Sequence, residues 1–122
     1  MNIEVSTGEI VDKFTILSIK LSRITEESKL NNVLTEYKYL EGIIRELNIE
    51  DEDLEPLHEV NQALWDIEDS IRERERMRLF DDVFIKLARN VYIQNDLRSE
   101  IKKQINIKYK SAFVEEKSYD KY

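Results

Sequence analysis

The chain has 122 residues, with two glycines, one proline and no cysteine, and its formal net charge is −7. The negative charge argues against general nucleic-acid binding, which needs a surplus of lysine and arginine, and no apolar run reaches the roughly 18 residues of a membrane span. The lack of cysteine excludes disulfides and thiolate metal sites. Because no basic N-terminal region indicates a signal peptide, we expect a soluble cytoplasmic protein.

The composition is typical of long amphipathic helices. Charged residues make up 37% and hydrophobic residues 41%, whereas a strand-rich fold uses more glycine and proline in its turns. We therefore predict one all-α domain over residues 1–122, built as an antiparallel helical bundle or a long helical hairpin of three to four helices. Residues 106–122 lose the helical periodicity and form an irregular C-terminal tail in this prediction.

The first half of the chain contains two predicted helices. Ser6 lies three residues before Glu9, a capping-box spacing that places a helix start near Thr7, and apolar residues at three-four spacing continue this helix to Ile24. The polar segment TEESKLNN then interrupts the pattern. A second apolar stripe predicts a helix over residues 30–47.

The second half contains one or two further helices. The acidic segment before Pro56 is interpreted as a solvated loop, and Pro56 fits the first turn of a third helix that ends near Leu79. Asp81 can cap a fourth helix, but no glycine or proline separates the two segments, so one continuous helix is the alternative. The tail has enough apolar and aromatic side chains to dock on the bundle: Phe113, Val114 and the tyrosines Tyr109, Tyr119 and Tyr122.

Polar side chains run directly beside the predicted apolar seams and form the candidate site. The third helix places four of them at steps of four, three and four residues: Asn61, Trp65, Glu68 and Arg72. In the fourth helix, three polar side chains lie one above another, those of Arg89, Tyr92 and Asp96. The amide of Asn95 lies next to them. The first helix has two carboxylates one turn apart and an adjacent lysine: Glu9, Asp12 and Lys13.

These side chains have two interpretations. If Glu9, Asp12, Glu68 and Asp96 converge, their oxygens suit Mg²⁺ or Mn²⁺, and Arg72 or Arg89 could then bind the anion of a phosphorylated ligand. In the other interpretation no cofactor is bound. Glu9 and Asp12 then stabilise the start of a helix, and Glu68 forms a half-buried ion pair with Arg72.

Several segments together resemble a family of short uncharacterised helical proteins, carried as a domain of unknown function in bacteria and their phages. The segments are VSTGEIVDKFTILSIKLSRI, LWDIEDSIRERE, FIKLARNVYIQNDLRSEIKKQIN and VEEKSY, the last of which ends at Tyr119. The resemblance covers nearly the whole chain and implies one helical domain. It implies no catalytic or binding role for any residue.

We therefore predict a non-catalytic interaction or assembly module, with a homodimer favoured and a protein partner as the other option. The alternative is a metal-dependent hydrolase of nucleotides or other phosphorylated small molecules. All-α nucleotide pyrophosphohydrolases place a Glu-Glu-x-x-Glu helix before a Glu-x-x-Asp helix. This chain has only Glu9-x-x-Asp12, so it departs from that pattern.

Overall fold

The computed structural model describes residues 1–118 and contains four helices in that range. They are α1 (Thr7–Arg23), α2 (Glu27–Glu46), α3 (Asp51–Arg76) and α4 (Asp82–Lys108). No strand occurs in the described residues, so the predicted all-α class is confirmed. None of these helices combines the length and the apolar character that crossing a bilayer requires. Tyr119 and Tyr122, which the sequence assigns to a docked tail, lie outside the described residues.

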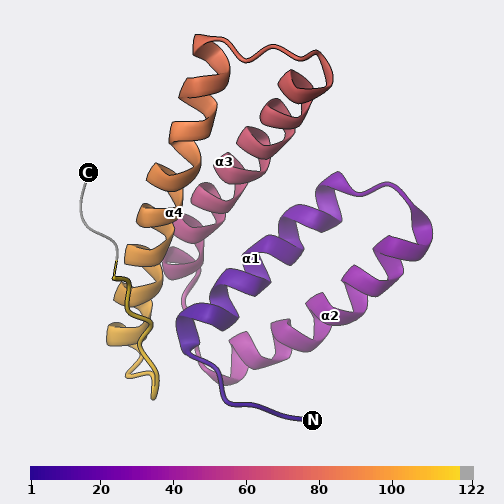
Figure 1. The fold of residues 1–122 in the computed structure, drawn as a ribbon. Coiled ribbons are helices and arrows are strands. Elements are labelled where there is room, and N and C mark those ends of the chain that lie inside the picture. The colour runs from indigo at the N-terminus through magenta and orange to yellow at the C-terminus, as the bar shows by residue number, and fades with distance from the viewer. Residues whose placement is uncertain (119–122) are drawn as a thin grey trace.

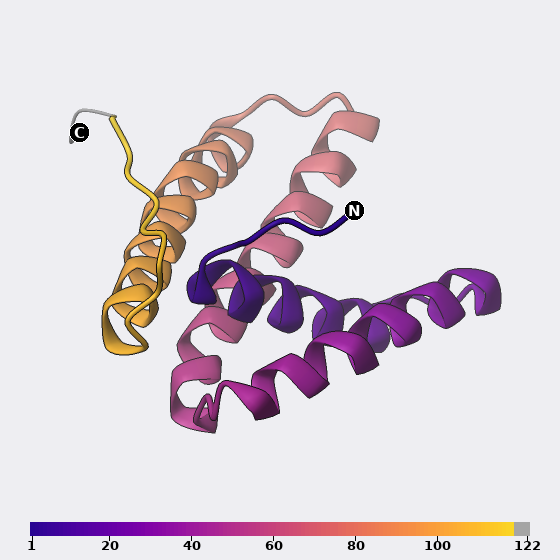
Figure 2. The same ribbon diagram turned by 90° about the horizontal axis from the view of Figure 1, so that it is seen from below.

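The helices form two antiparallel hairpins, α1–α2 and α3–α4, which diverge from a common base (Figure 1). Helix α1 is central, because it packs against α2, α3 and α4, whereas α2 packs against no other described helix than α1. The chain after α4 turns back and runs along that helix, as Figure 2 shows from below. The far ends of both hairpins extend away from the common base, as Figure 1 shows.

The apolar core lies at the base of the hairpins. Val11 and Leu57 are fully buried, and the same cluster contains Ile44, Ile49 and Ile105. Helix α1 begins as the sequence predicts, because the Ser6 hydroxyl accepts a hydrogen bond of 3.1 Å from the amide of Glu9. The base thus combines residues from all four helices, and the apolar stripes of the sequence indicate these residues correctly. Ile49 was not predicted, because it lies between α2 and α3 in the segment interpreted as a solvated loop.

Two predicted helix starts are wrong. Helix α2 begins at Glu27 rather than Leu30, so only a short part of the polar segment is a loop. Helix α3 begins at Asp51, and Pro56 lies inside it, so the acidic segment is mostly helical rather than a solvated loop. Acidic side chains in a first turn interact favourably with the positive end of the helix dipole, which explains why Asp51, Glu52 and Asp53 are helical.

The third and fourth helices are separate, so the continuous-helix alternative is wrong. Residues 77–81 form the turn, in which Arg78 adopts a left-handed φ of 52°. The Asp81 side chain accepts a hydrogen bond of 3.1 Å from the amide of Phe84 and caps α4, as predicted.

The C-terminal tail differs from its prediction in two ways. Helix α4 continues to Lys108, so the irregular segment begins after that residue rather than at Asn106. The tail does lie along α4 (Figure 1), but Phe113 and Val114 are exposed. Polar contacts hold it instead, including a hydrogen bond of 3.1 Å from the amide of Thr7 to the hydroxyl of Ser111.

Candidate functional site

A buried carboxylate, Asp12, lies where α1, α3 and α4 meet. Its side chain is 1% exposed. The Arg98 guanidinium donates to both of its oxygens, from Nε to Oδ1 at 2.9 Å and from Nη2 to Oδ2 at 2.5 Å. The Asn61 amide donates to Oδ1 at 2.9 Å. A buried carboxylate needs such partners, because its desolvation is otherwise very costly.

The polar contacts continue around Asp12. The Asn61 amide nitrogen also donates to the hydroxyl of Thr15 at 2.9 Å, and that hydroxyl donates to the backbone carbonyl of Asp12 at 2.8 Å. Asn61 of α3 thus bridges two consecutive turns of α1, at Asp12 and Thr15, and Arg98 of α4 holds the first of them. This network fixes the three helices in one register.

Lys102 extends the network along α4. Its side chain is 11% exposed, and its ammonium donates to Glu9 at 2.7 Å and to Glu115 of the tail at 3.3 Å, with Asp12 at 3.9 Å. Burial alone lowers the pKa of Lys102, but the hydrogen bond that Lys102 donates to Glu9 and the charge of Asp12 outweigh it, so the pKa is raised. The hydrogen bond to Asp12 likewise raises the pKa of Arg98. Both groups are therefore cations at neutral pH.

The first turn of α1 lies directly on α4. The amide of Gly8 donates to Oδ1 of Asn106 at 2.6 Å, and Asn106 is 1% exposed. A Cβ atom at Gly8 would lie 2.6 Å from the backbone oxygen of Lys102, so only glycine allows this approach. The Asn106 amide nitrogen is buried without a hydrogen-bond partner within residues 1–118, which costs free energy of folding.

A groove of about 570 Å³ lies beside this network. Its apolar wall consists of Ile16, Leu64 and Trp65. Its polar lining consists of Asn61, Glu68, Asp69, Arg72, Asn95 and Arg98. Glu68 and Arg72 form an ion pair at its edge, as predicted, and the Glu68 side chain is half-buried, with 47% of it exposed. The volume is within the range of about 300–1,000 Å³ that is typical of small-molecule pockets.

A smaller polar cavity of about 140 Å³ lies on the other side of Arg98. It is lined by Asn95, Arg98, Ser99, Lys102, Glu115 and Lys117. The groove and the polar cavity share Asn95 and Arg98, so the two spaces adjoin along one turn of α4.

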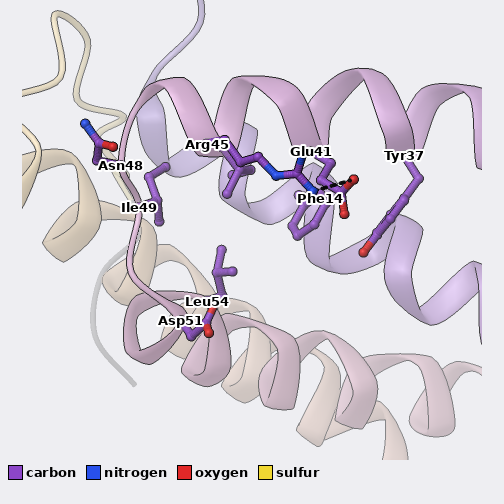
Figure 3. Close-up of a pocket in the computed structure, with 9 residues that line it drawn as sticks. Phe14, Tyr37, Glu41, Arg45, Asn48, Ile49, Asp51 and Leu54 are labelled. Carbon is purple, nitrogen blue, oxygen red and sulfur yellow. Dashed lines mark ion pairs between the residues drawn. The ribbon is translucent and has the colours of Figure 1, made fainter.

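A further cavity of about 550 Å³ lies at the base, between α2 and the start of α3 (Figure 3). The Phe14 ring stacks on Tyr37 with centroids 4.8 Å apart, and Arg45 pairs with Glu41 at 3.3 Å on its rim. Of its other lining residues, Ile44 and Ile49 belong to the core cluster and Leu54 packs against it. We interpret it as the open edge of the core.

The structure brings most of the predicted site residues together. Five of them line the groove: Asn61, Trp65, Glu68, Arg72 and Asn95. Glu9 and Asp12 lie in the adjoining ion-pair network. Four do not line the groove and are exposed on the surface: Lys13, Arg89, Tyr92 and Asp96.

The four carboxylates proposed as metal ligands do not cluster in the way that a metal site requires. Among residues 1–118, only Glu50, Glu52 and Asp53 place three possible ligand atoms within 4.8 Å of one another, at the start of α3. No three of the carboxylates of Glu9, Asp12, Glu68 and Asp96 do so. A metal site built from those four stays a prediction of the sequence without geometric support.

The cationic residues of the site, Arg98 and Lys102, were not predicted from the sequence. Asn95, Arg98, Lys102 and Asn106 follow one another at steps of three, four and four residues along α4. Of these residues, only Asn95 was assigned to the candidate site. A polar stripe at helical spacing, beside the weak apolar stripe of this helix, is the signal that could have identified them.

Comparison with known proteins gives one match. No curated protein and no solved structure matches the chain significantly. One family model matches residues 1–122, which is the whole sequence, and it is described as a family of unknown function. The resemblance of the four sequence segments to a family of uncharacterised helical proteins agrees with this match. The chain belongs to the family of unknown function DUF6165.

Proposed function

We propose that this chain is a non-catalytic interaction module that pairs with a second copy of itself through the end of the α3–α4 hairpin. The observation that carries the proposal is an apolar surface at this end. Large side chains around the turn are exposed to solvent: Met77, Leu79, Phe80, Val83 and Ile85. We call these five residues the hairpin tip. Contiguous exposed apolar surface on a small protein is typical of an interaction site.

The position of the hairpin tip supports this assignment. In Figure 1, the α3–α4 turn lies at the end of its hairpin opposite the common base. No residue of α4 before Lys102 is buried, whereas Lys102, Ile105 and Asn106 near its other end are. The half of the hairpin near the tip therefore has an uncovered apolar seam.

A second copy fits the tip better than an unrelated partner. Two antiparallel helices from each of two copies make a four-helix bundle, which buries the seams that one hairpin leaves open. The surrounding charges have both signs, with Arg74, Arg76 and Arg78 beside Glu75 and Asp82. In a two-fold symmetric dimer the same patch faces itself, so interleaved charges of both signs can complement one another.

An interaction module needs neither Mg²⁺ nor Mn²⁺. The oxygens of Asp12 already accept hydrogen bonds from Arg98 and Asn61. A thermal melt with and without each metal tests the hydrolase alternative, because a metal that binds only the folded state raises the melting temperature. A rise that is lost in Glu68→Gln would favour the hydrolase.

The lack of cysteine is compatible with a reducing compartment, and we place the protein in the cytoplasm on that basis. An origin in bacteria or their phages remains what the sequence resemblance implies.

Measuring the molar mass in solution by light scattering tests the dimer. We expect the wild type to elute as a dimer and Phe80→Glu to elute as a monomer, because a buried charge at the tip lacks a partner. Tyr39→Glu is the control, since Tyr39 is 70% exposed on α2, away from the tip. Circular dichroism checks that both variants remain helical. A monomeric wild type, or equal effects of both variants, would refute the proposed interface.

A further inference from the structure

The groove beside the Asp12 network contains a hydrogen-bond acceptor that no described residue uses. The Asn61 amide nitrogen donates to Oδ1 of Asp12 and to the Thr15 hydroxyl, both at 2.9 Å, which uses both of its hydrogens. The Asn61 carbonyl oxygen accepts no hydrogen bond within residues 1–118, although the residue is only 5% exposed. In the same range, the one fully buried side-chain atom without a partner is Nδ2 of Asn106, so the Asn61 oxygen remains accessible from the groove that Asn61 lines.

A carboxylate without an ion-pair partner belongs to the same lining. Glu68 pairs with Arg72, and Asp12 pairs with Arg98, so both arginines of the groove are already neutralised. Asp69 forms no hydrogen bond or ion pair with any other of the described residues. The groove therefore has one excess negative charge. The complementary ligand is a cation, which the net charge of −7 on the whole chain also attracts.

Trp65 lies between these two groups on α3. Asn61, Trp65 and Asp69 follow one another at steps of four residues, so they share one face of the helix. The helical rise places the first and the last about 12 Å apart along the axis. No aromatic ring or cation among residues 1–118 stacks on the Trp65 indole, and Leu64 and Ile16 extend the apolar wall beside it. An aromatic group against this wall loses its contact with water, and a nearby positive charge gains a cation–π attraction.

We propose that the groove binds a small elongated amine with an aromatic body and a neutral hydrogen-bond donor at its far end. The ammonium group lies beside Asp69, the ring lies against Trp65, and the donor, a hydroxyl or an amide N–H, binds the free oxygen of Asn61. The donor is neutral because Asn61 and the Arg98 guanidinium both bind Oδ1 of Asp12, so a second cation there is repelled. This site is independent of the proposed dimer at the hairpin tip.

Tyramine is a suitable probe, because its ammonium group, its ring and its phenolic hydroxyl follow one another along the molecule. The chain contains one tryptophan, so the indole N–H of Trp65 gives a single cross-peak of its kind in a nitrogen–proton correlation spectrum. We expect tyramine to shift this cross-peak saturably in the millimolar range.

Two analogues of tyramine test the two ends of the ligand. The Asn61 contact is tested from the ligand side, because Asn61 also holds Asp12 and its replacement would disturb the fold. Phenethylamine lacks the hydroxyl and should bind about fivefold more weakly, since a neutral hydrogen bond is lost. Hydroxyphenylpropionate has a carboxylate in place of the ammonium group and should not bind.

Two matched charge variants test the place of the cation. Asp69→Asn should raise the Kd of tyramine about fivefold, which is the upper range for an exposed ion pair. Glu59→Gln removes an exposed carboxylate from the same helix outside the groove and should leave the Kd unchanged. Circular dichroism checks that both variants remain helical. Equal effects of the two variants, equal affinities for tyramine and either analogue, or no saturable shift with tyramine would overturn the proposal.

Discussion

Arg98 of α4 donates two hydrogen bonds to the fully buried carboxylate of Asp12 in α1, across 86 residues of sequence. The pair joins the two hairpins, because α1 and α4 belong to different ones. Asn61 of α3 donates a further hydrogen bond to the Asp12 carboxylate. The relative placement of the hairpins thus depends on this buried ion pair as well as on the apolar core at the base.

This relationship predicts a marked loss of stability on removal of Arg98. Arg98→Met should lower the free energy of unfolding by about 3 kcal/mol or more, because Asp12 is left as a buried charge with incomplete pairing. Asp12→Asn should cost less, about 1–3 kcal/mol, because the Arg98 side chain is 29% exposed and can reach water. Urea denaturation followed by circular dichroism gives both values.

The double variant tests the coupling. Asp12→Asn with Arg98→Met should be more stable than the sum of the single losses implies, by about 1–3 kcal/mol, because neither partner then leaves an unpaired buried charge. Additive losses would show that the two side chains do not act as a pair.

The two glycines should respond in opposite directions to alanine. Gly8→Ala places a Cβ atom 2.6 Å from the backbone oxygen of Lys102, and we expect a loss of about 1–3 kcal/mol from the displacement of α1 against α4. Gly42→Ala meets no atom within 4 Å in the interior of α2, so it should stabilise the protein by about 0.5–1 kcal/mol. Thermal and urea denaturation of the two variants measure these changes. A Gly8→Ala variant as stable as the wild type would show that the helices separate easily at this point.

The start of α3 should contribute a component of acid sensitivity. Burial raises the pKa of Asp53, but hydrogen bonds from Lys108, at 2.7 Å, and Tyr109 outweigh it, so the pKa lies below the ordinary value of 3.8. A carboxyl group with a lowered folded-state pKa contributes stability above its unfolded pKa, and this contribution is lost as the pH falls through the folded value. We therefore expect Asp53→Asn to show a flatter decline of stability in the acid range than the wild type.

Urea denaturation at a series of acidic pH values measures this slope. Asp51→Asn is the matched control, because Asp51 is an exposed carboxylate in the same turn of α3. If both variants decline as steeply as the wild type, the contacts of Asp53 with Lys108 and Tyr109 do not form in solution.

Local sequence determined the helices and two of their starts. Ser6 and Asp81 cap α1 and α4 as their positions predict, because a cap depends on atoms only three residues away. The predicted start of α3 was wrong because two local signals disagree. Pro56 suggests a first helical turn, but the acidic residues before it also favour a helix N-terminus.

The candidate site was only partly predictable. The polar stripe with Asn61, Trp65, Glu68 and Arg72 was assigned correctly to one face of α3, because helical spacing fixes which residues share a face. Spacing does not reveal what that face meets. Asp12 was interpreted as a metal ligand or an acidic residue of the first turn, whereas the structure surrounds it with Arg98, Asn61 and Lys102.

The sequence by itself determined an all-α chain with its apolar stripes and its polar faces, because these follow from interactions within a few residues. Only the tertiary structure decided that α1 is the central helix, that Arg98 and Lys102 neutralise Asp12 and Glu9, and that Glu115 returns to the same cluster. The physical reason is that the stability of a buried charge depends on which opposite charges the fold brings near, and those partners lie up to 93 residues away in the chain.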